Sequence, residues 1–292
     1  MQHRAFSPRR LAAIASVTLT ELTRLRVFYV LLLFALVLIA SSMFMARMTF
    51  QQEFQVLKDI SLGAMSMFTS ILAIVATARM LPQDVDDRAV YTILAKPVPR
   101  FEYIAGKLGG VLLLLAISMV VMAALFCVVL FVRQQAVVSE TAAQMASMPP
   151  QELANALAEI RASTFNASLA PAIALIYIKA AVLAALTLFV STFATSTIFT
   201  IVIAVFVYFI GHLQASAREF WLSEHGGGWV SRTFLAVVAL LFPDLQLFDA
   251  VDHIVAGAAI PLALFAKTAA LGAFYTLIYL LVAAAVFSGR EL

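Results

Sequence analysis

The chain has 292 residues, of which 63% are hydrophobic and only 12% are charged, and its formal net charge is +3. A soluble domain of this size carries about twice that charged fraction, so the composition excludes an ordinary soluble protein. Several uninterrupted apolar runs reach the length of about 20 residues that crosses a bilayer as a helix. We therefore expect an all-α membrane protein that crosses the membrane several times.

Residues 8–26 are predicted to form an amphipathic helix ahead of the first span. Their apolar positions recur at helical spacing, at Leu11, Ile14, Thr18, Leu22 and Leu25. A basic amphipathic helix of this kind lies in the headgroup plane, so we expect an interfacial helix. The N-terminus lacks a short apolar stretch followed by a small-residue cleavage site, so no signal peptide is expected.

Six apolar runs are predicted to span the membrane. They cover residues 27–45, 61–81, 108–132, 172–193, 197–213 and 266–287. Gly106 and Gly110 stand at the entry to the third span, and such a small-xxx-small pair lets another helix approach closely. Cys127 lies within that span and is the single cysteine of the chain, so it forms no intrachain disulfide.

Two long polar segments separate the later spans. In residues 133–171 we expect a loop with one amphipathic helix on the membrane surface, whose apolar face contains Leu153, Leu157 and Ile160. Residues 214–265 include Trp221 and Trp229, which are typical of a membrane interface. The apolar run from Phe234 to Phe242 is too short to cross a bilayer, so we expect it to dip in or to pack against the bundle.

The positions of the cationic residues predict the topology. Six spans place both termini on one side, and 11 of the 19 Lys and Arg residues fall in residues 1–26, 79–107 and the C-terminal tail. By the positive-inside rule these three parts are cytoplasmic. Residues 46–60, 133–171 and 214–265 then face outward.

The most highly charged interval between two spans covers residues 82–107. Its charged residues are Asp84, Asp86, Asp87, Arg88, Lys96, Arg100, Glu102 and Lys107. Between the acidic and basic parts lie Val90, Tyr91, Ile93 and Leu94, followed by Pro97 and Pro99. The prolines favour a bent connector, and acidic residues at a helix start with cations near its end suit the helix dipole. We expect a short helix with one apolar face; the alternative is a plain solvated loop.

Few residues suggest chemistry. The chain has no GxxxxGK[ST] phosphate loop, so it is not expected to hydrolyse a nucleotide by that route. The acidic residues fall outside the centres of the predicted spans, which argues against proton or cation coupling. Lys179 and Lys267 are placed near outer helix ends, where they could snorkel. Asp249, Asp252 and His253 could gather around a metal, but an ordinary polar loop is favoured. We therefore expect no catalytic residue, cofactor or metal, and no nucleic-acid partner.

The 84–107 stretch resembles the first cytoplasmic loop of type-2 ABC exporter permeases. The resemblance is strongest to the branch associated with multicopper-enzyme maturation, which includes the permease of the nitrous oxide reductase maturation system. It rests on the acidic residues followed by Thr92-Ile93-Leu94-Ala95-Lys96-Pro97, on Arg100, and on Gly106-Lys107. Residues 243–248 (PDLQLF) and the terminal Arg290-Glu291-Leu292 also match. Asp86, Asp87 and Arg88 stand where the family often has a Glu and a Gly.

The resemblance implies one transmembrane permease domain over residues 1–292 with the type-2 exporter fold, in which residues 82–107 form a coupling helix. Asp84 to Arg88 would begin that helix, which docks into a separate cytoplasmic ATPase subunit that binds ATP and Mg²⁺. The docking residues implied are Asp84, Asp86, Asp87, Arg88, Val90, Tyr91, Ile93, Leu94, Lys96, Pro97 and Arg100. Arg100 and Lys107 would fix the connector. The family works with two permeases and two ATPase subunits, which implies a homodimer or a pair with a homologous permease in the bacterial inner membrane.

The expected function is that of the permease subunit of an ATP-driven exporter. A bundle predicted to lack buried charge suits an apolar or amphiphilic substrate, such as a membrane lipid. It equally suits mechanical work on an outer-side partner, for example a periplasmic accessory protein. The alternatives are a membrane-embedded lipid-modifying enzyme, which would need a convergent polar cluster, and a non-transporting membrane scaffold.

Overall fold

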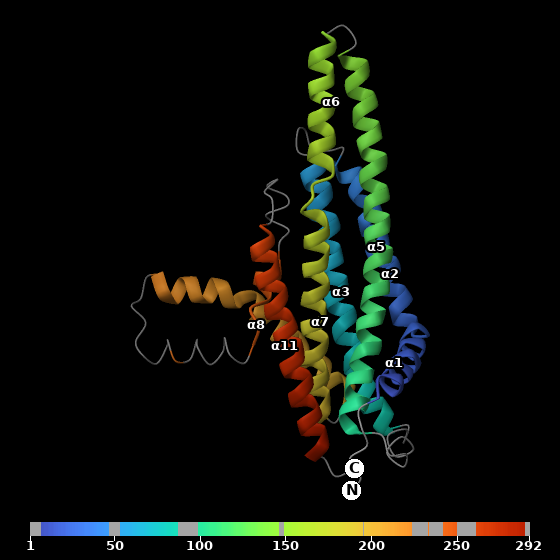
Figure 1. The fold of residues 1–292 in the computed structure, drawn as a ribbon, viewed down its shortest axis with the longest axis vertical. Coiled ribbons are helices and arrows are strands. Elements are labelled where there is room, and N and C mark those ends of the chain that lie inside the picture. The colour runs from blue at the N-terminus through green and yellow to red at the C-terminus, as the bar shows by residue number, and fades with distance from the viewer. Residues whose placement is uncertain are drawn as a thin grey trace.

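The computed structural model describes residues 7–46, 53–86, 99–145, 149–194, 196–223, 233, 242–249 and 261–289, and these contain helices and no strand (Figure 1). The α-helices are α1 (Pro8–Thr23), α2 (Arg26–Ala46), α3 (Glu53–Asp86), α5 (Arg100–Gln144), α6 (Pro150–Thr164), α7 (Leu169–Phe193), α8 (Thr197–Ser223) and α11 (Leu262–Gly289), and η1 (Leu245–Phe248) is a 3₁₀ helix. Six of the described helices, α2, α3, α5, α7, α8 and α11, are long and apolar enough to cross a membrane. The prediction of an all-α, multi-pass membrane protein is confirmed.

Two helices are much longer than the spans predicted within them. α3 begins at Glu53 and continues through Pro82 to Asp86, and α5 runs for 45 residues from Arg100 to Gln144. The predicted polar loops around both spans are therefore partly helical. Hydropathy misses these extensions because their charged side chains are paired with each other: Arg133 on α5 donates from Nε to Glu53 on α3 at 2.9 Å.

α6 differs from its predicted orientation. It runs antiparallel to the last turns of α5, and the two form a hairpin that projects beyond the other helices (Figure 1). A helix lying flat on a membrane would instead cross the bundle axis, so the expected surface orientation is wrong. The predicted apolar face, Leu153, Leu157 and Ile160, is half-buried in this arrangement.

α7 is the central helix of the bundle. It packs against α3 on one side and α11 on the other, and most of its spanning window is buried. Its alanines at 180, 184 and 185 are completely buried, and small residues of this kind let neighbouring helices approach closely. By contrast, large apolar side chains on α2, α8 and α11 are exposed, which fits helices whose outer faces contact lipid.

α1 covers the start of α5. Its buried residues, Ala15, Thr18 and Leu22, belong to the face predicted from helical spacing or adjoin it. A Cβ atom placed on Gly106 would lie 2.7 Å from the Cβ of Ile14, and one on Gly110 would lie 2.6 Å from the Cβ of Thr18. α1 is therefore the helix that approaches this glycine pair.

The start of α1, the end of α3, the start of α5 and the end of α11 meet at one end of the bundle, which we call the anchor end (Figure 1). The α5–α6 hairpin projects at the opposite end. Both ends of the described chain therefore lie on the same side, as six spans require.

Gly110→Ala is expected to lower the free energy of unfolding by about 1–3 kcal/mol, because the added methyl overpacks the α1–α5 contact. Gly109→Ala is the matched control, since its Cβ would lie 3.5 Å from the nearest side chain, that of Ala15. Thermal unfolding of both variants in detergent measures the difference. Equal midpoints for the two variants would show that α1 does not rest on Gly110.

Candidate functional site

The anchor end contains a network of buried charges between three helices. Lys107 on α5 pairs with Asp84 on α3, with Nζ and Oδ2 2.7 Å apart, and lies 3.6 Å from Glu21 on α1. The Tyr103 hydroxyl also donates to Asp84. The side chains of Lys107 and Asp84 are only 7% and 9% exposed, so the pair is shielded from solvent. It ties the last turns of α3 to the first turns of α5.

Glu102 joins α1 to the same part of α5. Arg10 donates from Nε to Oε2 at 2.7 Å and from Nη2 to Oε1 at 2.9 Å, and the backbone N–H of Ser7 donates to Oε1 at 2.9 Å. Such bidentate pairs are among the stronger polar contacts in proteins. The hydrogen bond from Glu102 raises the pKa of Arg10, so its guanidinium stays charged. Glu102 also lies in the first turn of α5, where the helix dipole favours a carboxylate.

Arg100 joins α5 to the end of α11. Its guanidinium donates to the carbonyl oxygen of Phe287 at 3.2 Å and to that of Ser288. The ring of Tyr103 stacks on that of Phe287 with centroids 5.8 Å apart. A cation at these carbonyls also suits the negative end of the α11 dipole.

The structure describes part of the predicted docking set, and the side chains of Asp84 and Arg100 contact the bundle. Asp84 is buried within α3, so it does not begin a new helix as expected, and Arg100 reaches α11. Asp86 is the last residue of α3. The other predicted docking residues lie outside the described residues: Asp87, Arg88, Val90, Tyr91, Ile93, Leu94, Lys96 and Pro97.

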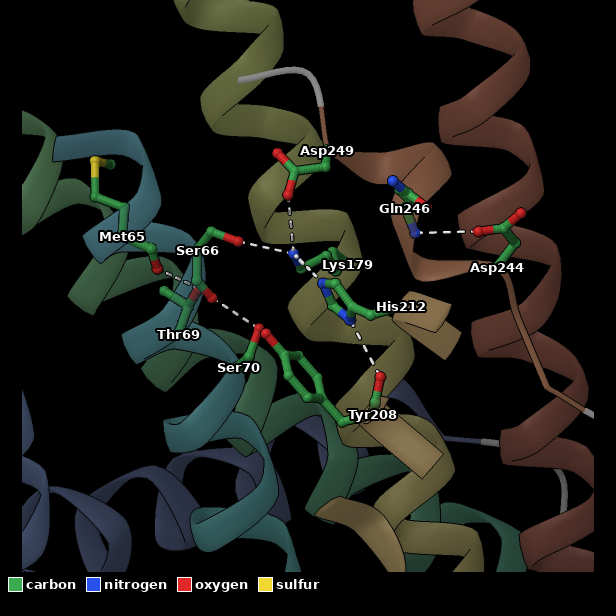
Figure 2. A network of polar contacts seen from close by, with 10 residues as sticks. All are labelled: Met65, Ser66, Thr69, Ser70, Lys179, Tyr208, His212, Asp244, Gln246 and Asp249. Carbon is green, nitrogen blue, oxygen red and sulfur yellow. Dashed lines mark hydrogen bonds and ion pairs between the residues drawn. The ribbon is translucent and has the colours of Figure 1, made fainter. Parts of the chain in front are cut away.

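A second polar site lies inside the bundle, where α3, α7, α8 and the segment 242–249 converge (Figure 2). It surrounds a cavity of about 350 Å³ that we call the Lys179 pocket. The cavity is lined by Asp59, Gly63, Ser66, Met67, Lys179, Tyr208, His212, Gln246 and Asp249. Site residues from four elements meet here although they are far apart in the sequence.

Lys179 is at the centre of this pocket and is 1% exposed. Its Nζ lies 2.8 Å from Ser66 Oγ, 3.4 Å from His212 Nε2 and 3.8 Å from Asp249 Oδ2 (Figure 2). His212 Nδ1 lies 3.1 Å from the carbonyl oxygen of Tyr208. A proton on Nδ1 satisfies that carbonyl and leaves Nε2 as an acceptor for the Lys179 ammonium. Lys179 thus donates to Ser66 Oγ and faces polar groups from two further elements, His212 on α8 and Asp249 after η1.

The segment 242–249 is wedged into the bundle and brings Asp249 to the pocket. Leu245 and Phe248 in η1 are fully buried, and the Asp244 side chain caps η1 by accepting from the N–H of Gln246 at 3.2 Å. Gly211 makes room for this segment, because a Cβ there would lie 2.7 Å from Leu245 Cγ. Residues 242–249 of the predicted outer segment 214–265 are therefore part of the bundle. Of the run Phe234–Phe242, the structure describes Phe242, which packs half-buried against the core.

The prediction that Lys179 snorkels to an outer helix end is wrong. Lys179 lies ten residues after the start of α7 at Leu169, which is about 15 Å along the helix axis. The expectation of a bundle without buried charge is wrong for the same reason. One signal was visible in the sequence: Lys179 is the single charged residue in α7, and an ionisable residue inside a span marks a candidate site. Lys267, by contrast, is exposed on α11.

The weak metal motif gains no support from the part of the chain that the structure describes. Asp249 contacts Lys179, while Asp252 and His253 lie outside the described residues. Among the described residues no group of three or more His, Cys, Asp or Glu side chains could hold a metal ion.

Comparison with known proteins adds no family: no protein-family model matches the chain, and no curated protein is significantly similar to it.

Glu102→Gln is expected to lower the free energy of unfolding by about 2 kcal/mol, because it removes the charge-assisted bidentate contact with Arg10. Limited trypsin digestion is expected to cleave α1 faster in this variant. Glu152→Gln, at an exposed position of α6, is the control and should behave as the native chain. Unchanged cleavage of α1 in Glu102→Gln would contradict its role as the anchor of that helix.

Proposed function

We propose that the chain is the transmembrane subunit of an ATP-driven ABC exporter, and that residues 87–98 receive force from a cytoplasmic ATPase subunit. One observation carries the proposal: both flanks of this segment are tied to the bundle by polar contacts, which are buried at Asp84 and half-buried or exposed at Arg100. Asp84 on its N-terminal side is bonded to Lys107 and Tyr103, and Arg100 on its C-terminal side is bonded to α11. A force on the segment would therefore reach α3, α5, α11 and, through Glu21 and Glu102, α1.

The type of contact supports a mechanical role. Burying an ion pair costs several kcal/mol per ion, and apolar residues of similar volume often stabilise a protein equally well. Directional contacts at both flanks of one segment thus favour transmission of movement over stability alone. Within the segment, the sequence places four apolar residues between charged ones, and we propose that they dock on the partner: Val90, Tyr91, Ile93 and Leu94. ATP and Mg²⁺ would bind to the partner, and two copies of each subunit would form the complex.

The α5–α6 hairpin favours one version of this function. It projects beyond the other helices at the end opposite the anchor end (Figure 1). With the anchor end in the cytoplasm, the hairpin stands on the outer side of a bacterial inner membrane. There it could act on an outer-side partner, so mechanical work on that partner is the second outcome we propose for ATP hydrolysis.

The enzyme alternative also has an observation in its favour, because Ser66 and Lys179 are close enough for a serine–lysine pair at 2.8 Å. One feature argues against hydrolysis. Ser66 lies in the middle of α3, where backbone N–H groups are used within the helix and cannot stabilise an oxyanion. We therefore favour binding over catalysis at this pocket.

Replacement of Ile93 and Leu94 by Asp is expected to abolish co-purification of an ATPase subunit, because it removes the apolar docking face. The measurement is a pull-down of the chain in mild detergent from its native host, followed by an ATPase assay of the eluate. Ala154→Asp with Asn155→Asp adds two acidic residues on an exposed part of α6 and is the control. Full retention of the ATPase by the 93/94 variant, or its absence from the native eluate, would refute the proposal.

The proposed topology predicts opposite labelling at the two ends. In a Cys127→Ser background, Ser139→Cys near the hairpin should react with a membrane-impermeant maleimide in spheroplasts. Ser16→Cys on α1 should react only after permeabilisation. Both positions are exposed in the structure, so burial does not explain a difference. The reverse pattern would place the anchor end outside and exclude a cytoplasmic ATPase partner there.

A further inference from the structure

The contacts of the Lys179 ammonium differ in length, and this difference indicates room for a ligand. An ammonium group has three N–H donors, and a charge inside a span is costly unless they are satisfied. Ser66 Oγ meets one donor at 2.8 Å, but His212 Nε2 and Asp249 Oδ2 lie at 3.4 and 3.8 Å. Normal hydrogen bonds to nitrogen donors are about 2.7–3.2 Å long, so the charged partner of Lys179 is its most distant one.

Space for a better partner is present at the same place. The cavity of about 350 Å³ is lined by Lys179 itself, together with the hydroxyl of Ser66 and the amide of Gln246, which can both donate to an anion. Two carboxylates also line it. Asp59 is exposed at the surface of α3, and the Asp249 side chain is 36% exposed. An anion entering the pocket would therefore compete with Asp249 for Lys179.

The surroundings of the pocket are apolar. Met67 lines the pocket and is 53% exposed on α3. On α8, Phe209 and Leu213 are 56% and 62% exposed and adjoin the pocket residues Tyr208 and His212 in sequence. Both helices are long and apolar enough to span the membrane, so an acyl chain could lie along them while its polar end reaches Lys179.

We propose that the Lys179 pocket binds the acid group, a carboxylate or a phosphate, of an amphiphile whose chain lies against α3 and α8. The acid group takes the place of Asp249 beside the Lys179 ammonium, and Ser66 and Gln246 donate to it. Asp249 acts as an internal competitor that neutralises Lys179 when the pocket holds no ligand. The binding proposal depends only on the pocket. The statement that the bound amphiphile is the cargo of the exporter rests on the proposed function.

The test measures binding to the full chain purified in a neutral maltoside detergent. The probes are dodecanoate and dodecyl phosphate, with dodecanol as the uncharged control and acetate and inorganic phosphate as soluble anions. Lys179→Gln is expected to weaken binding of the acid amphiphiles about tenfold, the effect of losing one charge-assisted contact. Lys267→Gln, at the exposed lysine of α11, should leave it unchanged, and Lys179→Arg should retain most of it. Gel filtration confirms that each variant is folded.

Asp249→Asn gives a test that does not depend on removing Lys179. Since it removes the competitor, it is expected to tighten binding of dodecanoate and dodecyl phosphate about threefold or more. Binding of acetate or phosphate as tight as that of dodecanoate and dodecyl phosphate, with the same dependence on Lys179, would show that the ligand is a small anion and would overturn the amphiphile. Equal binding of dodecanol, no effect of Lys179→Gln, or weaker binding in Asp249→Asn would overturn the proposal. ATPase capture by the 93/94 variants does not involve this pocket, so the two proposals fail separately.

Discussion

A charge in the apolar interior of this bundle requires a polar partner from another helix, and the rest of the structure depends on this constraint. Moving an ion out of water costs several kcal/mol even after relaxation. Lys107 meets Asp84 across α5 and α3, Arg133 meets Glu53 across the same helices, and Lys179 meets Ser66 across α7 and α3. Polar side chains that bond across helices hold membrane bundles together. Because these contacts are directional, they help to determine how the helices are aligned along their axes.

α3 takes part in all three of these contacts and physically connects the two candidate sites. Asp84 lies at the anchor end, and Ser66 lies eighteen residues earlier, about 27 Å away along the helix axis. A movement of the anchor end would therefore displace one wall of the Lys179 pocket. The segment 242–249 forms another wall and is held by η1 against α7 and α8. Opening or closing of the pocket then depends on how α3 moves relative to that segment, so α3 is a physical route from the anchor end to the pocket.

The fold could be predicted from the sequence in good part, and the candidate sites only partly. The apolar runs predicted six long helices because a bilayer demands about 20 apolar residues for each crossing. The spacing of Leu11, Thr18 and Leu22 predicted the packed face of α1. The helical extension of α5 to Gln144 was not predicted, because the polar and charged residues after 132 were interpreted as a loop. In the structure, Arg133 in this extension is paired with Glu53 on α3. Lys179 was predicted to lie near an outer helix end, whereas it is buried inside the bundle.

The sequence by itself determined the class of the protein, the number of long apolar helices and the charged segment between α3 and α5. These follow from composition and periodicity, which are properties of neighbouring residues. Only the tertiary structure decided that Asp84 turns inward to Lys107, that α1 rests on Gly110, and that Asp249 reaches Lys179. Such contacts join residues far apart in the chain. Their geometry depends on how helices pack and on which polar groups the apolar interior forces together.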